Sequence, residues 1–200
     1  MKLDIVIAGV GGQGSVLASR VIAQAAMAAG WEVRTTETIG MAQREGSVVS
    51  HVRIGSQLYG ALVPDQQADI LFGLELAETA RALMKLKPGG VIIANQGKVV
   101  PASVSLGLSH YAEEPIRESL YQKTKRVMLV DADALAMEAG NSKTVNVVLL
   151  GVLSALAGLP FRRDDLLQVI LESVPKKAVA MNQEAFERGR KIGVTFHDRK

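Results

Sequence analysis

The segment DIVIAGVGGQGS, residues 4–15, decides the fold of this chain. Its first half is an apolar run that predicts a strand, and its second half places Gly9, Gly11 and Gly14 in the pattern G-x-G-x-x-G. Residues 15–29 follow with small side chains and helix formers, which predict a helix. A glycine turn between a strand and a helix is the context that this pattern requires. Such a turn offers backbone N–H groups and the positive end of a helix dipole to phosphate or another anion.

The residues of the turn are the first candidate ligand contacts: Gly9, Gly11, Gly12, Gln13, Gly14 and Ser15. The glycines permit a tight turn and the close approach of a ligand or of a neighbouring backbone. Taken alone, the motif fits a nucleotide-type ligand and a turn used only for packing equally well. The amide of Gln13 could contact a ligand or hydrogen-bond the loop. For Ser15 we favour a helix-capping role, which is compatible with a phosphate contact.

A second group of candidates lies at the end of the strand expected over residues 31–38, which is rich in β-branched side chains, and in the loop that follows it. Glu37 stands about twenty residues past the turn, where a dinucleotide-binding domain places an acid for the ribose hydroxyls, although a solvated glutamate is the commoner case. Residues 39–49 predict a functional loop at the carboxyl edge of the sheet. In that loop, the forked guanidinium of Arg44 suits an anion, or an ion pair with Glu37 or Glu45.

The rest of the chain continues the alternation of strands and helices. An antiparallel hairpin is expected from two short strands over residues 50–54 and 58–63. We expect further strands over 69–72, 91–94 and 127–130, and helices over 74–86, 115–125, 144–157, 164–174 and 177–192. The predicted fold class is therefore α/β: a three-layer, Rossmann-like single domain over residues 1–200, with a mostly parallel sheet, a small antiparallel hairpin insertion and C-terminal helices.

Composition narrows the function classes. The chain has 200 residues, of which 48% are hydrophobic, so it can bury a substantial core. A net charge of +3 with 4% aromatic residues does not favour a nucleic-acid surface. Because the chain has no cysteine, it supplies no disulfide, no thiolate nucleophile and no cysteine ligand for zinc or an iron–sulfur cluster.

Catalytic, metal and membrane roles find little support in the sequence. The three histidines are far apart, at 51, 110 and 197, so we assign no metal site and no catalytic residues. His51 and Arg53 are expected on one face of a strand, and Asp131 is expected to cap the segment that follows it. The longest apolar stretch, residues 145–159, is too short and too polar to span a membrane. The N-terminus leads directly into a strand, and we expect a cytoplasmic protein.

Three segments together resemble the gamma-type component of 2-oxoacid:ferredoxin oxidoreductases. They are GVGGQG at residues 9–14, MAQREGSVVSHVR at 41–53 and KAVAMNQEAFERG at 177–189, so the likeness covers most of the chain. The nearest resemblance is to the beta subunits of indolepyruvate ferredoxin oxidoreductases. The joint match is specific, whereas the glycine pattern alone is not.

The resemblance implies a subunit that is inactive alone, in an enzyme that decarboxylates an aryl pyruvate with coenzyme A and passes two electrons to ferredoxin. It implies that thiamine diphosphate and the iron–sulfur clusters belong to a large partner subunit, which also contacts ferredoxin. Coenzyme A is the expected ligand of the glycine turn, with Arg44 across the cleft. Glu45 replaces the small residue expected beside Arg44, so the loop could instead dock onto the partner. A nucleotide-binding regulatory or interaction module that uses Glu37 for a ribose is the alternative.

Overall fold

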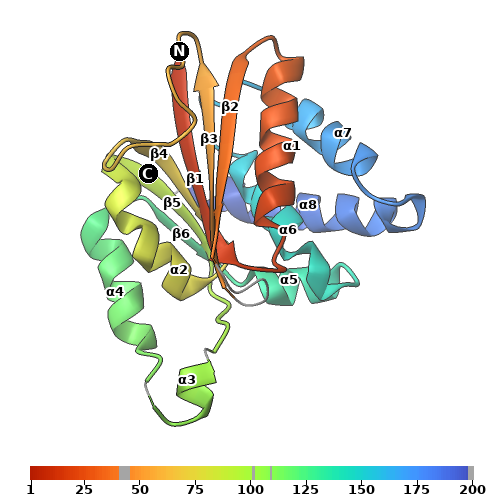
Figure 1. Cartoon of the computed structure of the whole chain (residues 1–200). Coiled ribbons are helices and arrows are strands. Elements are labelled where there is room, and N and C mark those ends of the chain that lie inside the picture. Colours follow the sequence, from red (N-terminus) through yellow and green to blue (C-terminus); the bar gives the residue numbers. More distant parts are fainter. Residues whose placement is uncertain (41–45, 101, 109, 198–200) are drawn as a thin grey trace.

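A six-stranded sheet forms the centre of the structure, which is a computed structural model that describes residues 1–40, 46–100, 102–108 and 110–197 (Figure 1). The strand order is β2-β3-β1-β4-β5-β6. Strand β3 runs antiparallel to both of its neighbours, and the other five strands are parallel to one another. The strands are β1 (Lys2–Val10), β2 (Glu32–Ile39), β3 (Ser47–Gly55), β4 (Ala68–Gly73), β5 (Leu86–Asn95) and β6 (Val127–Val130).

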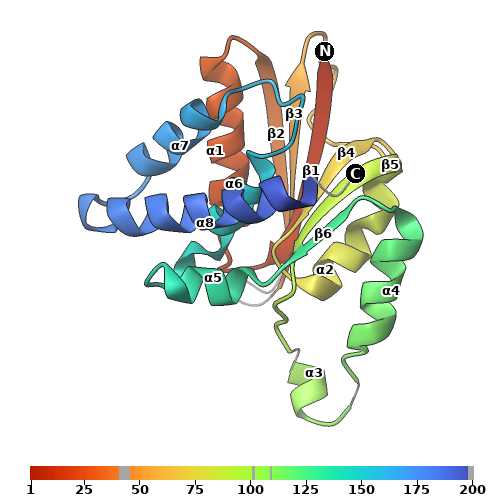
Figure 2. The same ribbon diagram turned by 180° about the vertical axis from the view of Figure 1, so that it is seen from behind.

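Helices cover both faces of the sheet, which confirms the predicted three-layer α/β architecture (Figures 1 and 2). One face carries α2 and α4, and the other carries α1, α5, α6, α7 and α8. Their bounds are α1 (Ser15–Ala28), α2 (Leu76–Arg81), α4 (Glu113–Lys123), α5 (Ala132–Glu138), α6 (Val145–Leu153), α7 (Arg163–Glu172) and α8 (Val179–His197). A further short helix, α3 (Ala102–Ser105), lies in an arm that projects from the carboxyl end of the strands.

Strand β1 lies inside the sheet and is apolar at successive positions because helices cover both of its faces. Its side chains alternate between two hydrophobic cores: Ile5 and Ile7 pack on the side of α1, whereas Val6 and Ala8 pack on the side of α2. All four side chains are fully buried. A strand covered by helices on both faces needs apolar residues at every position, and residues 5–8 provide them.

The antiparallel hairpin lies elsewhere than predicted. It is formed by β2 and β3, which pair from Glu32 with Gly55 to Ile39 with Val48. Residues 58–63 form no strand, so the predicted partner segment was wrong. Arg53 explains the difference, because its Nη1 atom donates to the carbonyl oxygens of Gly60 (3.2 Å) and Leu62 (3.3 Å). A side chain thus satisfies acceptors that a neighbouring strand would otherwise use.

Two predicted helices are shorter in the structure, and one helix was not predicted. The helix expected over 74–86 is shorter, since α2 ends at Arg81 and a 3-10 turn (Ala82–Lys85) leads directly into β5. The helix expected over 144–157 ends at Leu153. Helix α5 was not expected, but Asp131 caps it as predicted, because its Oδ1 atom accepts a hydrogen bond from the Ala134 N–H (3.0 Å).

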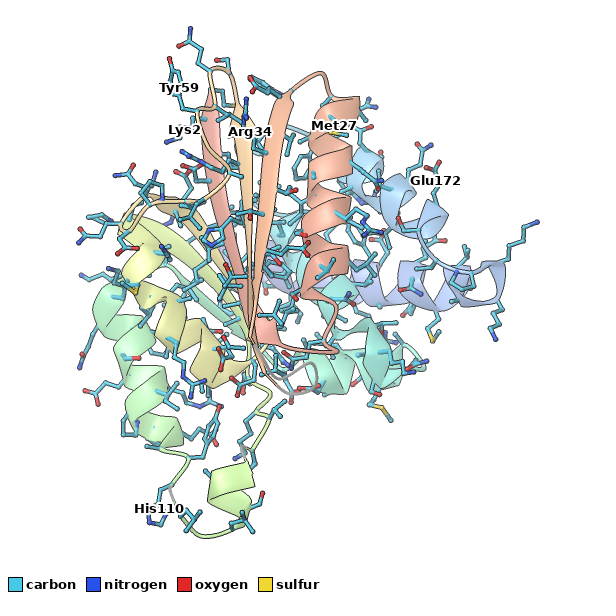
Figure 3. All side chains as sticks on the ribbon, viewed as in Figure 1. Lys2, Met27, Arg34, Tyr59, His110 and Glu172 are labelled. Atoms are coloured by element: carbon cyan, nitrogen blue, oxygen red, sulfur yellow. The ribbon has the colours of Figure 1, made fainter. Side chains whose placement is uncertain are left out.

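The two ends of the sheet carry different features. His110 marks the tip of the arm beyond the carboxyl ends of the parallel strands, whereas Lys2, Arg34 and Tyr59 lie at the opposite end (Figure 3). In α/β sheets of this kind, ligands bind beyond the carboxyl ends of the strands. Among the described residues, no helix combines the length and apolar character needed to cross a bilayer.

Candidate functional site

The glycine turn lies at the carboxyl end of β1, between this strand and the first turn of α1. Gly12 and Gly14 have φ angles of +95° and +82°, in the region that L-residues with a side chain avoid. Gly14 is the N-cap of α1, and its carbonyl oxygen accepts the first helical hydrogen bond, from Ala18 (2.9 Å). The turn therefore requires glycine for its backbone conformation and directs the N-terminus of a 14-residue helix to this edge.

Ser15 is not the helix cap that the sequence favoured. Gly14 takes that position, and Ser15 is the first residue of the helix. The N-cap therefore lies one residue earlier than predicted. The left-handed conformation of Gly14 explains this difference, because the chain changes direction at Gly14 and is already helical at Ser15. Ser15 is only 4% exposed, yet it lines a hollow at the turn.

Gln13 holds the turn together. Its Oε1 atom accepts a hydrogen bond from the Val10 N–H (2.9 Å), and its Nε2 atom donates to the carbonyl oxygen of Leu74 (3.4 Å). A side chain on Gly9 would meet this amide, because an added Cβ atom would lie 2.9 Å from Oε1. Gln13 therefore stabilises the turn through hydrogen bonds within the protein, which is the second of the two roles that the sequence left open for it.

A hollow of about 470 Å³ opens beside the turn. Its volume is within the usual range of small-molecule sites. The lining residues come from the turn, from the first two turns of α1 and from the start of β3: Gly11, Gly12, Gly14, Ser15, Val16, Leu17, Arg20 and Val48. Four of the predicted contacts, Gly11, Gly12, Gly14 and Ser15, therefore share one hollow.

Arg20 is the cation of this hollow, and the sequence analysis did not identify it. It follows Val16 by four residues, so both side chains lie on one face of α1. Within the described residues, none of the ion pairs involves Arg20. The helical spacing from the glycine turn was the signal that could have found it. Arg44, the cation predicted from the sequence, lies outside the described residues.

Gly46 and Ser47, which follow Arg44 in the chain, contact the glycine turn and α2. The Gly11 N–H donates to the carbonyl oxygen of Gly46 (2.9 Å). Ser47, the first residue of β3, donates from its hydroxyl to Oε2 of Glu78 (2.6 Å), a carboxylate that is 4% exposed. The loop therefore returns to the sheet at the edge of the glycine turn.

Glu37 does not have the position that a dinucleotide-binding acid requires. In such domains the second strand lies next to the first, whereas here β3 is inserted between β1 and β2. The insertion moves Glu37 away from the turn by about one strand spacing, roughly 5 Å. Its Oε1 atom accepts a hydrogen bond from the hydroxyl of Ser19 on α1 (3.3 Å). Contact with a helix explains this glutamate without a ribose.

A polar network links the turn to the carboxyl ends of β4, β5 and β6. The carbonyl oxygen of Leu74 accepts from both Gln13 and the buried Asn95 Nδ2 (3.3 Å). The same Nδ2 atom donates to Asp133 (2.9 Å), and Nδ2 of the buried Asn146 donates to the carbonyl oxygen of Gly14 (3.4 Å). Asn95 and Asn146 were missed in the sequence, although a polar residue that ends a buried strand is the signal for Asn95.

Glu75 fixes the base of the projecting arm. This carboxylate is 1% exposed, and its Oε2 atom accepts from the Glu78 N–H (2.8 Å) as the N-cap of α2. Its Oε1 atom accepts from the Val99 N–H (3.3 Å) and from the Tyr111 hydroxyl (2.6 Å). Burial, followed by the hydrogen bond to Glu75, raises the pKa of the Tyr111 phenol well above its ordinary value. Both ends of the arm are thus attached to one buried carboxylate.

His51 and Arg53 lie on one face of β3, as predicted, but serve the fold. The Nδ1 atom of His51 accepts from the Val63 N–H (3.3 Å). Burial, followed by the charges of Lys85 and Arg53, lowers the pKa of His51 below its ordinary value. Arg53 forms a two-bond ion pair with Asp4 (2.8 and 3.2 Å), whose side chain is 1% exposed. Together, these contacts hold the irregular segment 58–63 against the sheet.

Among the residues with described positions, neither metal ligands nor an acid–base set assembles around the hollow. Within the described ranges, no group of three or more histidine, aspartate or glutamate side chains is arranged to hold a metal ion. The site instead offers backbone N–H groups at a helix N-terminus, a buried hydroxyl and a cation, which suit an anion.

Comparisons with known proteins point to one family. The family model described as pyruvate ferredoxin/flavodoxin oxidoreductase matches residues 4–192. The chain is 42% identical over 192 residues to the indolepyruvate oxidoreductase subunit IorB of Thermococcus kodakarensis, with 95% of each chain covered. It is 41% identical over 190 residues to the subunit of the same name from Archaeoglobus fulgidus, with 94% of each chain covered.

Solved structures confirm the fold. The gamma subunit of a keto/oxoacid ferredoxin oxidoreductase from Geobacter sulfurreducens matches with a TM-score of 0.71 and 24% identity, over 96% of this chain and 99% of that chain. A 2-oxoglutarate:ferredoxin oxidoreductase from Magnetococcus marinus, with 2-oxoglutarate, coenzyme A and succinyl-CoA bound, matches with a TM-score of 0.73 and 24% identity. That match covers 97% of this chain but 31% of that chain.

Proposed function

Because the chain belongs to the pyruvate ferredoxin/flavodoxin oxidoreductase family, we propose that it is the non-thiamine subunit of an indolepyruvate ferredoxin oxidoreductase. The observation that carries this proposal is the 42% identity to an indolepyruvate oxidoreductase subunit over 95% of both chains. The enzyme would convert an aryl 2-oxoacid and coenzyme A into an acyl-CoA and carbon dioxide, with two electrons passed to ferredoxin. The chain is one subunit of this oxidoreductase and is inactive alone.

The division of labour between subunits follows from the residues present. The chain has no cysteine to ligate an iron–sulfur cluster, so this chemistry belongs to a partner, and membership of the family implies that thiamine diphosphate belongs there too. We propose that this partner is a large subunit that holds both groups and contacts ferredoxin, and that the complex is cytoplasmic. Residues 1–200 would act within it as a single domain that supplies an anion site and an interface.

Coenzyme A is the ligand that we propose for the hollow at the glycine turn. The hollow has room for the phosphate part of this molecule rather than for the whole of it. Gly12 carries no side chain, and the space that a Cβ atom would take there is open, so phosphate oxygens can approach the backbone of the turn. The hydroxyl of Ser15 and the guanidinium of Arg20 line the same space and can donate to these oxygens. When bound, coenzyme A supplies the thiol that accepts the acyl group.

Each side chain of the site then has a distinct role. Arg20 neutralises phosphate charge, and Arg44 is proposed as a second cation from the loop that returns at Gly46. Gln13 and Asn146 keep the turn in its shape through Val10, Leu74 and Gly14. We assign no proton transfer to this chain.

Calorimetry with the full chain tests this proposal against the nucleotide-binding alternative. Coenzyme A should bind with higher affinity than NAD or ATP. Tighter binding of NAD with loss on Glu37→Gln would instead support a ribose site. In the reconstituted two-subunit enzyme, Arg20→Gln should raise the KM for coenzyme A by about 10- to 150-fold, since a hydrogen bond to a charged group contributes about 1.5–3 kcal/mol.

Arg34→Gln is the matched control, because it removes the same charge from an exposed side chain at the opposite end of the sheet. Its KM for coenzyme A should equal that of the parent enzyme. If both variants change the KM equally, the effect comes from net charge, and the role of Arg20 is wrong.

A further inference from the structure

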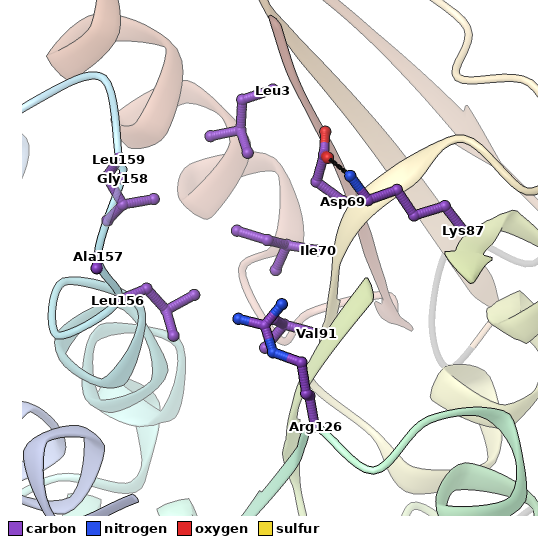
Figure 4. A pocket seen from close by; sticks show the side chains of 10 residues that line it. All are labelled: Leu3, Asp69, Ile70, Lys87, Val91, Arg126, Leu156, Ala157, Gly158 and Leu159. Atoms are coloured by element: carbon purple, nitrogen blue, oxygen red, sulfur yellow. Dashed lines mark hydrogen bonds and ion pairs between the residues drawn. The ribbon is translucent and has the colours of Figure 1, made fainter. Parts of the chain in front are cut away.

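A second hollow lies at the end of the sheet opposite the glycine turn. It has a volume of about 170 Å³ and opens between the amino ends of β1, β4 and β5 and the segment 156–159 that follows α6 (Figure 4). The proposed coenzyme A site does not involve this space, because the two hollows have no lining residue in common. Its lining combines an apolar wall with charged groups at the rim, which is the composition of a small-molecule site.

The apolar wall comes from both layers. Leu3, Ile70 and Val91 project from the sheet and are less than 10% exposed, and Leu156 and Leu159 face them across the opening (Figure 4). An apolar cavity of about 150 Å³ is large enough to bind benzene. With a total volume of about 170 Å³, the hollow therefore has room for one aromatic ring against this wall.

The charged side chains at the rim determine which ligand charge the hollow favours. The carboxylate of Asp69 pairs with Lys87 and also accepts from the Asp4 N–H (2.7 Å), so it is already occupied. Arg126, which directly precedes β6, extends into the opening (Figure 4). Its Nη1 atom donates to the Gly89 carbonyl oxygen (3.3 Å). No ion pair among the described residues involves this guanidinium.

We propose that this hollow is a binding site for a small aromatic carboxylate. The ring packs between Ile70 and Leu156, and the carboxylate accepts hydrogen bonds from Arg126. An amine would be repelled by the guanidinium and would find no free carboxylate to pair with, and a neutral aromatic compound would gain no charge-assisted hydrogen bond from it. The proposal is independent of the coenzyme A site, because the two hollows share no residue.

Titration of the full chain with phenylacetate, followed by calorimetry and by methyl NMR, tests the proposal. Phenylacetate should bind at a single site and shift the methyl signals of Ile70, Val91 and Leu156. Phenylacetamide has nearly the same shape without the charge and should bind at least about tenfold more weakly, as should phenylacetate with Arg126→Gln. Lys125→Gln removes the same charge one residue away without lining the hollow, and should leave the affinity unchanged.

A second variant reduces the hollow without touching Arg126. Ala157 lines the space from an exposed segment, so Ala157→Leu should fold normally and abolish phenylacetate binding by occupying the volume of the ring. The proposal is overturned if phenylacetate does not bind up to its solubility limit, or if Arg126→Gln and Ala157→Leu bind it as the parent does. Signal shifts confined to the glycine turn would also overturn it.

Discussion

Gly12→Ala separates the role of the glycine turn in ligand binding from its role in the fold. Gly12 has a φ angle of +95°, which costs an L-residue about 1–2 kcal/mol. An added Cβ atom would have no other heavy atom within 4 Å, so no steric clash adds to this cost. For a chain of 200 residues, the melting temperature should fall by about 2–8 °C, at roughly 2–4 °C per kcal/mol.

Gly30→Ala provides the matched control. Gly30 has a φ angle of +86° and equally open space, but it follows the other end of α1 and does not line the hollow. Both variants should lose similar stability in thermal unfolding. Only Gly12→Ala should weaken the binding of coenzyme A, because its methyl group keeps the phosphate away from the backbone N–H groups of the turn.

The affinity loss follows from the bond that is blocked. One hydrogen bond from a backbone N–H to a charged phosphate contributes about 1.5–3 kcal/mol, so Gly12→Ala should raise the KM for coenzyme A in the reconstituted enzyme by about 10- to 150-fold. The reasoning is refuted if Gly12→Ala shows the expected loss of stability with the parent KM. A KM that rises equally in Gly30→Ala would refute it too.

Two further substitutions test the packing and the pH response of the fold. Gly189→Ala should lower the free energy of unfolding in urea by about 1–3 kcal/mol, because the new Cβ atom would clash with the Val148 carbonyl oxygen at the α6–α8 contact. Gly60→Ala is the control: its Cβ atom would enter open space, and the free energy of unfolding should change by less than about 0.5 kcal/mol. Since the pKa of His51 is lowered on folding, the unfolded chain binds more protons below about pH 6.5, and stability should fall as the pH drops below this value. His51→Asn, whose amide oxygen can accept from Val63, should show a smaller fall in its urea midpoint between about pH 7.5 and 5.5; an equal fall would contradict the assignment.

Local patterns were sufficient to predict the centre of the fold. The apolar residues 5–8 and the glycines after them determine a buried strand, a left-handed turn and a helix start, all within a few residues of one another. The pattern of residues 58–63 also suggested a strand, but Arg53 satisfies carbonyl groups of this segment from another strand. A contact between a side chain and a distant backbone leaves no periodic signal in the sequence.

The site was predictable in part for the same reason. The sequence predicted four residues that line the hollow, because they belong to one short motif: Gly11, Gly12, Gly14 and Ser15. Asn146 reaches this site from 132 residues away, and its role depends on how α6 packs against the turn. Glu37 had the expected spacing, but the insertion of β3 beside β1 moved it away from the turn.

Ferredoxin reduction by the reconstituted complex tests the central claim most directly. The rate would be measured with indolepyruvate and coenzyme A for the large subunit alone, for this chain alone, for both together, and for the large subunit with Gly12→Ala. The account predicts full activity only for the parent pair, none for this chain alone, and normal assembly with a raised coenzyme A requirement for Gly12→Ala. Activity of this chain alone, or a large subunit whose coenzyme A dependence is the same without it, would contradict the account.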